Sequence, residues 1–259
     1  MALARRGVLR IAVFRSRVAG LPYAFAHPAA VVPVAKLLGA RAVPSALAIG
    51  AMIPDVWYFV PFVERQHTHD LPDALWFCLP AGVLAYAAFH LIFKQPLIAL
   101  APRPLAGRLA RWATPGLPRA PWLLVLLSLV AGIATHLAWD VFTHEGSLRI
   151  LDTRVAGGFY LHQVLQHTST LLGGVFVAAW VWRKLRATQP VAIADTLEAR
   201  LRFAVAGMMI GFPAAVFLGV LRALSAHIEP LALRAAGVTA FSAFGLVTLL
   251  YCLGWKLAR

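Results

Sequence analysis

Long apolar stretches separated by shorter polar segments form the dominant pattern of this chain. Six of them have about 20 residues each, the length that an α-helix needs to cross a bilayer. One further apolar stretch, residues 28–39, is too short to cross. We therefore predict an all-α, polytopic integral membrane protein with about six transmembrane helices and one short N-terminal apolar helix. The predicted spans are residues 44–63, 72–93, 122–143, 161–182, 203–224 and 235–255.

The composition supports this prediction and narrows the possible partners. Hydrophobic residues make up 61% of the 259 residues and charged residues 13%, against about 45–50% and about 25% in soluble domains. A net charge of +14 is compatible with nucleic-acid binding, but the basic residues lie between the apolar stretches, where they act as topology signals. We expect the lipid bilayer as a partner and no nucleic acid. Cys78 and Cys252 lie in apolar stretches and are interpreted as core residues.

The basic residues of the loops predict the orientation in the membrane. Loops 94–121 and 183–202 hold five Lys or Arg residues each, whereas loops 64–71 and 144–160 hold three between them. Loops that face the cytoplasm carry the excess of basic residues. We therefore predict a multi-pass protein of the bacterial inner (cytoplasmic) membrane, with loops 94–121 and 183–202 and the C-terminus in the cytoplasm.

Residues 1–20 differ from the rest of the chain because they hold five arginines and only short apolar runs. These runs are too short for the hydrophobic region of a signal peptide, so we predict no cleaved signal. The segment is interpreted as a basic surface helix, a disordered tail or a stretch upstream of the genuine start. No long polar linker divides residues 21–259, which we predict to form a single helical membrane domain.

The candidate chemistry centres on residues 134–144, ATHLAWDVFTH, at the end of a predicted span. His136, Asp140 and His144 follow one another at intervals of four residues, which places all three on one face of a helix. Ionisable groups inside a membrane are costly and usually functional. The spacing therefore predicts a polar site that faces other parts of the chain.

Other histidines and acids are predicted to reach the same depth. If residues 28–39 and 44–63 form a helical hairpin, His27 and Asp55 lie near each other. His69 lies in the polar loop that follows. Imidazole and carboxylate ligands together suit Zn²⁺, Mn²⁺ or Fe²⁺ better than Ca²⁺, so we predict a divalent metal, with zinc as the first choice. The predicted ligands are His27, Asp55, His69, His136 and Asp140, and the predicted acid/base group is His144 or Asp70.

Each of these residues also has an ordinary structural interpretation. Asp55 follows Pro54 and could cap a helix that begins there, and His136 could form an internal hydrogen bond with Asp140 one turn away. Four separate segments place such residues at the same predicted depth, and this convergence favours a polar or metal site over the structural interpretations. The alternative is a non-enzymatic membrane protein that uses the cluster for helix packing, proton or metal passage, or partner binding.

The stretches around the predicted site resemble a known bacterial family. They are LPYAFAHPAAVVPVAKLLG, ALAIGAMIPDVWYF, HTHDLPDALWFCLP and THLAWDVFTHEG, and they are similar to domain of unknown function 4184 over about residues 21–186. Members of that family usually open with Met-Pro-Phe-x-x-Ser-His-Pro. Leu21-Pro22-Tyr23 stands at the corresponding place, so the resemblance implies that residues 1–20 lie upstream of a family-like start.

A more distant resemblance concerns the order His, Pro-Asp, His-Thr/Ser and His-x-x-x-Asp. It is similar to the membrane-bound metal-dependent hydrolases and the zinc-dependent phospholipase C-like proteins, and it implies metal roles for the five predicted ligands. Arg65-Gln66 departs from the Arg-Gly of the hydrolase pattern. His162 and His167 stand where aromatic residues are expected, so no ligand role is assigned to them. We predict a membrane-embedded metal-dependent hydrolase that acts on a lipid or lipid-linked phosphoester at the outer half of the membrane.

Overall fold

The fold is all-α, as predicted. The computed structural model describes residues 26–59, 63–145, 147–155, 158–193, 197–224 and 229–259. These residues contain no β-strand; Arg154 and Tyr160 form an isolated antiparallel bridge. Two compact units are distinguished: one holds the described residues of 26–94 and 107–192, the other those of 95–106 and 193–259. The predicted tail of residues 1–20 lies outside the described residues, and the single membrane domain over 21–259 stays a prediction.

Among the described residues, five helices are long and apolar enough to cross a membrane, so the chain is a multi-pass membrane protein. Large apolar side chains such as Leu84, Leu171 and Phe203 are exposed on their surfaces, which suits contact with lipid rather than water. The five spans are Asp73–Leu100, Trp122–Thr143, Leu161–Ala187, Ala199–Leu224 and Ala235–Leu257.

The predicted span over residues 44–63 is interrupted. The α-helix α3 covers Pro44–Met52, and the chain continues as a 3₁₀ turn over Ile53–Tyr58. Pro54 favours a break here, because it has no N–H group to donate to the preceding helical turn. The described residues therefore hold five long helices rather than the six predicted, and Asp55 lies on the 3₁₀ turn just after the break.

Several helices extend beyond their predicted ends. Helix α5 (Asp73–Ala88) continues through a π-helical turn (Phe89–Phe93) into α6 (Lys94–Leu100). Basic residues end an apolar run but are good helix formers, and their stems can lie along apolar surface. Hydropathy alone therefore places the ends too early. The remaining helices are α2 (Pro28–Leu38), α4 (Gln66–His69), α7 (Arg103–Ala110), α8 (Trp122–Thr143), α9 (Leu161–Ala187), α10 (Ala199–Leu224) and α11 (Glu229–Leu257).

The packing of α3 against α8 positions the predicted site. The two backbones approach closely at two glycines: a methyl group on Gly50 would collide with the carbonyl of Leu129, and one on Gly132 with the carbonyl of Leu47. Small residues allow such close helix contacts in membranes. The hairpin predicted for the two N-terminal apolar stretches is also present, with Val31 of α2 packed against Leu47 of α3.

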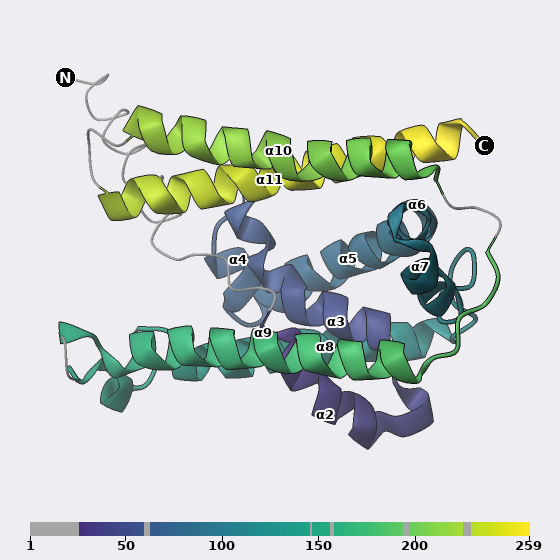
Figure 1. Cartoon of the computed structure of the whole chain (residues 1–259). Helices are drawn as coiled ribbons and strands as arrows, with labels where there is room; N and C mark the ends of the chain where they lie inside the picture. The colour runs from purple at the N-terminus through teal and green to yellow at the C-terminus, as the bar shows by residue number, and fades with distance from the viewer. Residues whose placement is uncertain (1–25, 60–62, 146, 156–157, 194–196, 225–228) are drawn as a thin grey trace. The chain divides into compact units, whose positions relative to one another are not determined.

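Helices α10 and α11 belong to the other unit and lie side by side (Figure 1). The Tyr251 hydroxyl of α11 donates a hydrogen bond to the Pro96 carbonyl of α6 at 2.8 Å. Cys252 beside it is buried and free, as is Cys78 in α5. Both cysteines therefore occupy packed positions, as the sequence indicated.

We expect the residues that flank α9 to lie on opposite sides of the membrane. Ser147 precedes this helix of 27 residues and Gln189 follows it, and 27 residues span about 40 Å. Single cysteines at these positions, in a background with Cys78→Ala and Cys252→Ala, test the predicted orientation. An impermeant thiol reagent added to intact spheroplasts should label Ser147→Cys alone, and after permeabilisation both variants should be labelled. Labelling of Gln189→Cys alone would invert the predicted orientation.

Candidate metal centre

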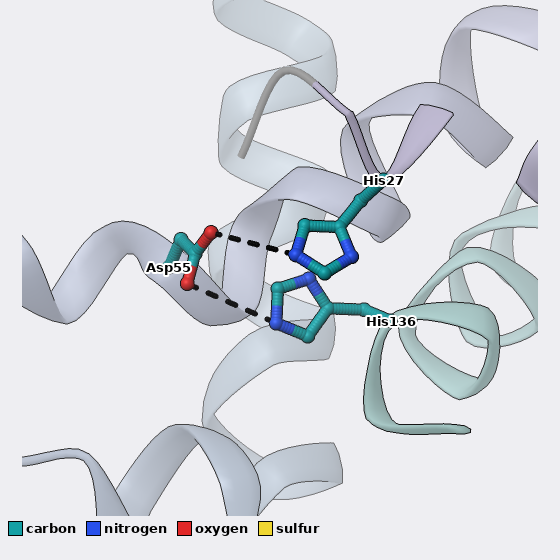
Figure 2. Close-up of side chains that lie close together, drawn as sticks. All are labelled: His27, Asp55 and His136. Atoms are coloured by element: carbon teal, nitrogen blue, oxygen red, sulfur yellow. Dashed lines mark ion pairs between the residues drawn. The ribbon is translucent and has the colours of Figure 1, made fainter. Parts of the chain in front are cut away.

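The five predicted ligands come together in one cluster. They are contributed by the residue before α2, the 3₁₀ turn after α3, the short helix α4 and the last two turns of α8. Figure 2 shows three of them, with both His27 and His136 facing the carboxylate of Asp55. The side chain of His136 is fully buried and those of the other four are less than one-tenth exposed. The five are His27, Asp55, His69, His136 and Asp140.

Asp140 lies at the centre of the cluster. Its two carboxylate oxygens are close to ring nitrogens of four histidines, at 3.2 Å for His69 Nε2, 3.4 Å for His144 Nδ1, 3.7 Å for His136 Nε2 and 3.9 Å for His27 Nε2. Asp55 is the second acid. Its oxygens lie 3.8 Å from His136 Nε2 and 4.0 Å from His27 Nε2. The rings of His27 and His136 stack with their centroids 3.9 Å apart.

The proton of His136 can be assigned from its hydrogen bond to α3. Its Nδ1 lies 2.8 Å from the Ala51 carbonyl oxygen, which can only accept, so Nδ1 is the donor and carries the proton. In the neutral ring, Nε2 then presents a lone pair. This buried atom has no hydrogen-bond partner among the described residues. It instead faces oxygens of both carboxylates at 3.7 and 3.8 Å.

His69 has a close partner at each ring nitrogen. Its Nδ1 lies 2.7 Å from the Thr68 hydroxyl, and its Nε2 lies 3.2 Å from Asp140, within hydrogen-bond distance. Of these two histidines, the tautomer is therefore fixed for His136 alone, whose Nε2 presents the lone pair that a metal ligand needs.

Acceptors facing acceptors in a buried site are costly unless a proton or a metal ion lies between them. The separations from His136 Nε2 to the two carboxylates, 3.7 and 3.8 Å, are too long for hydrogen bonds. They are slightly longer than the separation of ligand atoms around a tetrahedral zinc, about 3.4 Å for bonds of about 2.1 Å. Two sets of three ligand atoms lie within 4.8 Å of one another: His27, Asp55 and His136, and His69, His136 and Asp140. The cluster therefore fits a divalent metal.

A comparison with protein families identifies the family of this chain. Residues 21–253 match the family described as a domain of unknown function (DUF4184). The chain belongs to this family. The match reaches well beyond residue 186, where the resemblance in the sequence ended, and covers most of α11. All five cluster residues lie inside it. No curated protein and no solved structure matches the chain.

Of the two residues predicted as acid/base groups in this DUF4184 member, only His144 reaches the cluster. Its Nδ1 lies 3.4 Å from Asp140 and 3.2 Å from the Thr143 hydroxyl. That hydroxyl donates to Trp139, so His144 Nδ1 is itself a donor. Burial lowers the pKa of His144, although the charge of Asp140 acts in the opposite direction. Asp70, in contrast, is exposed and forms no ion pair with the described residues of the cluster.

Arg65 belongs to the cluster although sequence reasoning assigned it no role. Its Nη2 donates to Asp140 Oδ2 at 3.3 Å. Arg65 precedes His69 by four residues, the spacing of one helical turn, and α4 begins at the next residue. That spacing is the signal that could have indicated a shared face, had the loop been recognised as helical.

Two other polar clusters lie apart from this centre. His162, near the start of α9, contacts the Leu151 carbonyl and Asp152, so it is held against the turn that precedes this helix. In the turn from α5 to α6, His90 lies 2.9 Å from both the Ser45 hydroxyl and Lys94 Nζ. Both histidines therefore have protein partners that account for their burial.

Proposed function

We propose that this DUF4184 protein is a metal-dependent hydrolase that acts on a lipid or lipid-linked phosphoester. The observation that carries the proposal is the buried lone pair of His136 Nε2, which faces two carboxylates and has no hydrogen-bond partner among the described residues. His69 supports it as a third imidazole-carboxylate contact of the cluster, with Nε2 3.2 Å from Asp140. This arrangement of ligand atoms is costly without a cation and favourable with one.

The five ligands would hold one or two divalent ions, with zinc as the first choice. Imidazoles together with carboxylates form a donor set typical of Zn²⁺, Mn²⁺ or Fe²⁺. His136 belongs to both sets of three ligands, but its Nε2 has one lone pair and serves one ion. Bound there, the ion would supply Lewis acidity that polarises a phosphoryl oxygen and activates water.

His144 is the proposed acid/base residue. Its Nδ1 is held by Asp140 and Thr143, which leaves Nε2 to take a proton from the attacking water or to give one to the leaving group. The His144 side chain is 28% exposed, whereas those of the five ligands are less than one-tenth exposed. Substrate would therefore approach the cluster from the His144 side.

The position of the cluster in the membrane supports a lipid substrate. His136 lies seven residues before the end of α8, a depth of about 10 Å at 1.5 Å per residue. The headgroup layer of each leaflet is about 5–7 Å thick, so a lipid-borne phosphate lies within a few ångströms of this depth. The predicted orientation assigns the site to the outer half of the bacterial inner membrane.

The alternative is a non-enzymatic role for the cluster in packing or in metal or proton passage. Packing is disfavoured because buried polar groups usually close to hydrogen-bond distance, while His27 and His136 stay 3.7–4.0 Å from the carboxylates. Passage requires a route on the far side of the cluster, where His136 is fully buried.

The test combines metal analysis with an assay of lipid hydrolysis. Wild-type protein purified in detergent should contain about one or two metal ions per chain, and it should release phosphorylated headgroups from mixed lipids. A chelator should lower turnover at least about 10-fold, and added Zn²⁺ should restore it. His136→Ala should lose both metal and turnover. Wild-type protein that carries no metal under any loading condition would favour the non-enzymatic alternative, and metal without turnover on any phospholipid would reject the substrate.

A further inference from the structure

Arg65 and His144 are the two most exposed side chains of the cluster, and Arg65 is the more exposed of the two. One nitrogen of its guanidinium contacts the buried Asp140 at 3.3 Å, yet the Arg65 side chain is 41% exposed and that of Asp140 only 8%. This is the one hydrogen bond that the Arg65 side chain makes to the residues that the structure describes. A guanidinium has five N–H donors. Most of this donor set is therefore accessible to a molecule that approaches the cluster.

The formal charges around Arg65 favour an anion once a metal is bound. Asp55 and Asp140 contribute two negative charges, which a divalent ion would cancel. Bound to a metal, His69 and His136 would be neutral lone-pair donors and would add no charge. When one ion balances the two carboxylates, the positive charge of Arg65 stays uncompensated in a largely buried site, where charge is poorly screened. Without Arg65 the loaded site would be neutral.

Arg65 and the metal would compete for the same oxygen. Asp140 Oδ2 accepts from Arg65 Nη2, and the same atom lies 3.2 Å from His69 Nε2 and 3.7 Å from His136 Nε2. An ion held by these two histidines and Asp140 would draw on that oxygen and weaken its bond to Arg65. The guanidinium would then need another acceptor, and its fork geometry matches two oxygens of a phosphate group.

We propose that Arg65 is the substrate-binding residue that takes the non-bridging oxygens of a phosphate group once Asp140 is engaged by the metal. This inference rests on the proposed function, since it requires a loaded site. It adds the chemical class of the ligand, a phosphoryl oxyanion. That oxyanion belongs either to a lipid headgroup or to a soluble phosphoester.

The test measures phosphate binding and metal binding separately. Protein loaded with Zn²⁺ and freed of excess metal is titrated with inorganic phosphate, followed by calorimetry or phosphorus NMR, and its zinc affinity is measured against a chromophoric chelator. Arg65→Gln should weaken phosphate binding at least about 10-fold, and Arg65→Lys should weaken it less, because lysine keeps the charge but not the fork. Zinc affinity without phosphate should stay the same or rise in Arg65→Gln, because a competitor for Asp140 is gone.

Arg149→Gln is the matched control, because Arg149 is an exposed arginine in the turn that precedes α9. It should bind phosphate and zinc as the wild type does. Equal phosphate affinity in wild type and Arg65→Gln would overturn the inference while leaving the metal site intact. A fall in zinc affinity in Arg65→Gln would also overturn it, since Arg65 would then only hold Asp140 in place. Wild-type protein without zinc would overturn the proposed function and this inference together.

A second titration identifies the source of the phosphate group. Short-chain phosphatidic acid carries the same oxyanion on a lipid, so it is compared with inorganic phosphate on the zinc-loaded wild type. Binding at least about 10-fold tighter for the lipid would assign the site to headgroups, because apolar contacts then add to the contact with Arg65. Equal binding would assign it to a soluble phosphoester. In either case the loss caused by Arg65→Gln should be the same.

Discussion

Replacing Asp140 with asparagine is expected to abolish stoichiometric metal binding while the helical fold survives. Asparagine keeps the volume of the side chain but removes the charge that faces four histidines and Arg65. Loss of residues that merely support metal ligands lowers metal affinity about 10–100-fold, so loss of a central charged ligand should cost at least about 100-fold. Elemental analysis of the protein purified in detergent measures the effect, with circular dichroism as the check on the helices.

The matched control for this change is Asp70→Asn. Asp70 is exposed and follows directly after the ligand His69, so it tests charge loss at the same end of the cluster without removing a ligand. It should retain the metal content of the wild type. Equal metal content in Asp140→Asn and wild type would show that any bound metal lies elsewhere.

Replacing Gly132 with alanine should destabilise the protein and displace the metal centre at once. The added methyl would meet the carbonyl of Leu47 and the backbone around Gly50 and Ala51. Overpacking costs about 1–3 kcal/mol in ordinary cores, and a backbone neighbour cannot rotate away, so we expect a cost of about 3 kcal/mol. The higher helix propensity of alanine offsets about 1 kcal/mol of this destabilisation. A net loss of about 2 kcal/mol should appear as a lower midpoint of thermal unfolding in detergent.

The control for Gly132→Ala is Gly174→Ala in α9, where a methyl group would meet nothing within 4 Å. This variant should unfold at or slightly above the wild-type temperature, because only the helix propensity changes. Zinc affinity should fall in Gly132→Ala alone, since α8 must shift and the hydrogen bond from His136 to Ala51 must lengthen. Wild-type stability in Gly132→Ala would mean that α3 and α8 do not approach as closely as described.

The residues of α8 show what sequence alone can predict about this site. Helical periodicity fixes the faces of a long helix, so the spacing of His136, Asp140 and His144 was sufficient to group them. The interruption at Pro54 was missed for a different reason. Hydropathy measures apolar content, whereas the continuity of a helix depends on its backbone hydrogen bonds, which a proline removes. The proline itself was visible in the sequence.

Arg65 and Asp70 show where prediction from sequence fails. Arg65 reaches an acid 75 residues later in the chain, and only the packing of the helices establishes that contact. Asp70 follows His69 directly, but the backbone leaves the helical conformation there, with φ −90° and ψ 126°. Neighbouring residues then point in different directions, so adjacency to a ligand says little about reaching the same ion.

The cluster draws its ligands from positions as far apart as His27 and Asp140, with Asp55 and His69 between them. An ion held there would act as a cross-link between four segments that are otherwise joined by packing and by hydrogen bonds such as those of His136 to Ala51 and of Arg65 to Asp140. A ligand that binds the folded chain alone adds about 2.7 kcal/mol of stability at a free concentration of one hundred times its dissociation constant. The lifetime of this protein in the cell would then depend on the supply of metal. When the ion is scarce, the less stable apo-protein would be degraded by membrane proteases, so the amount of protein would fall together with its activity.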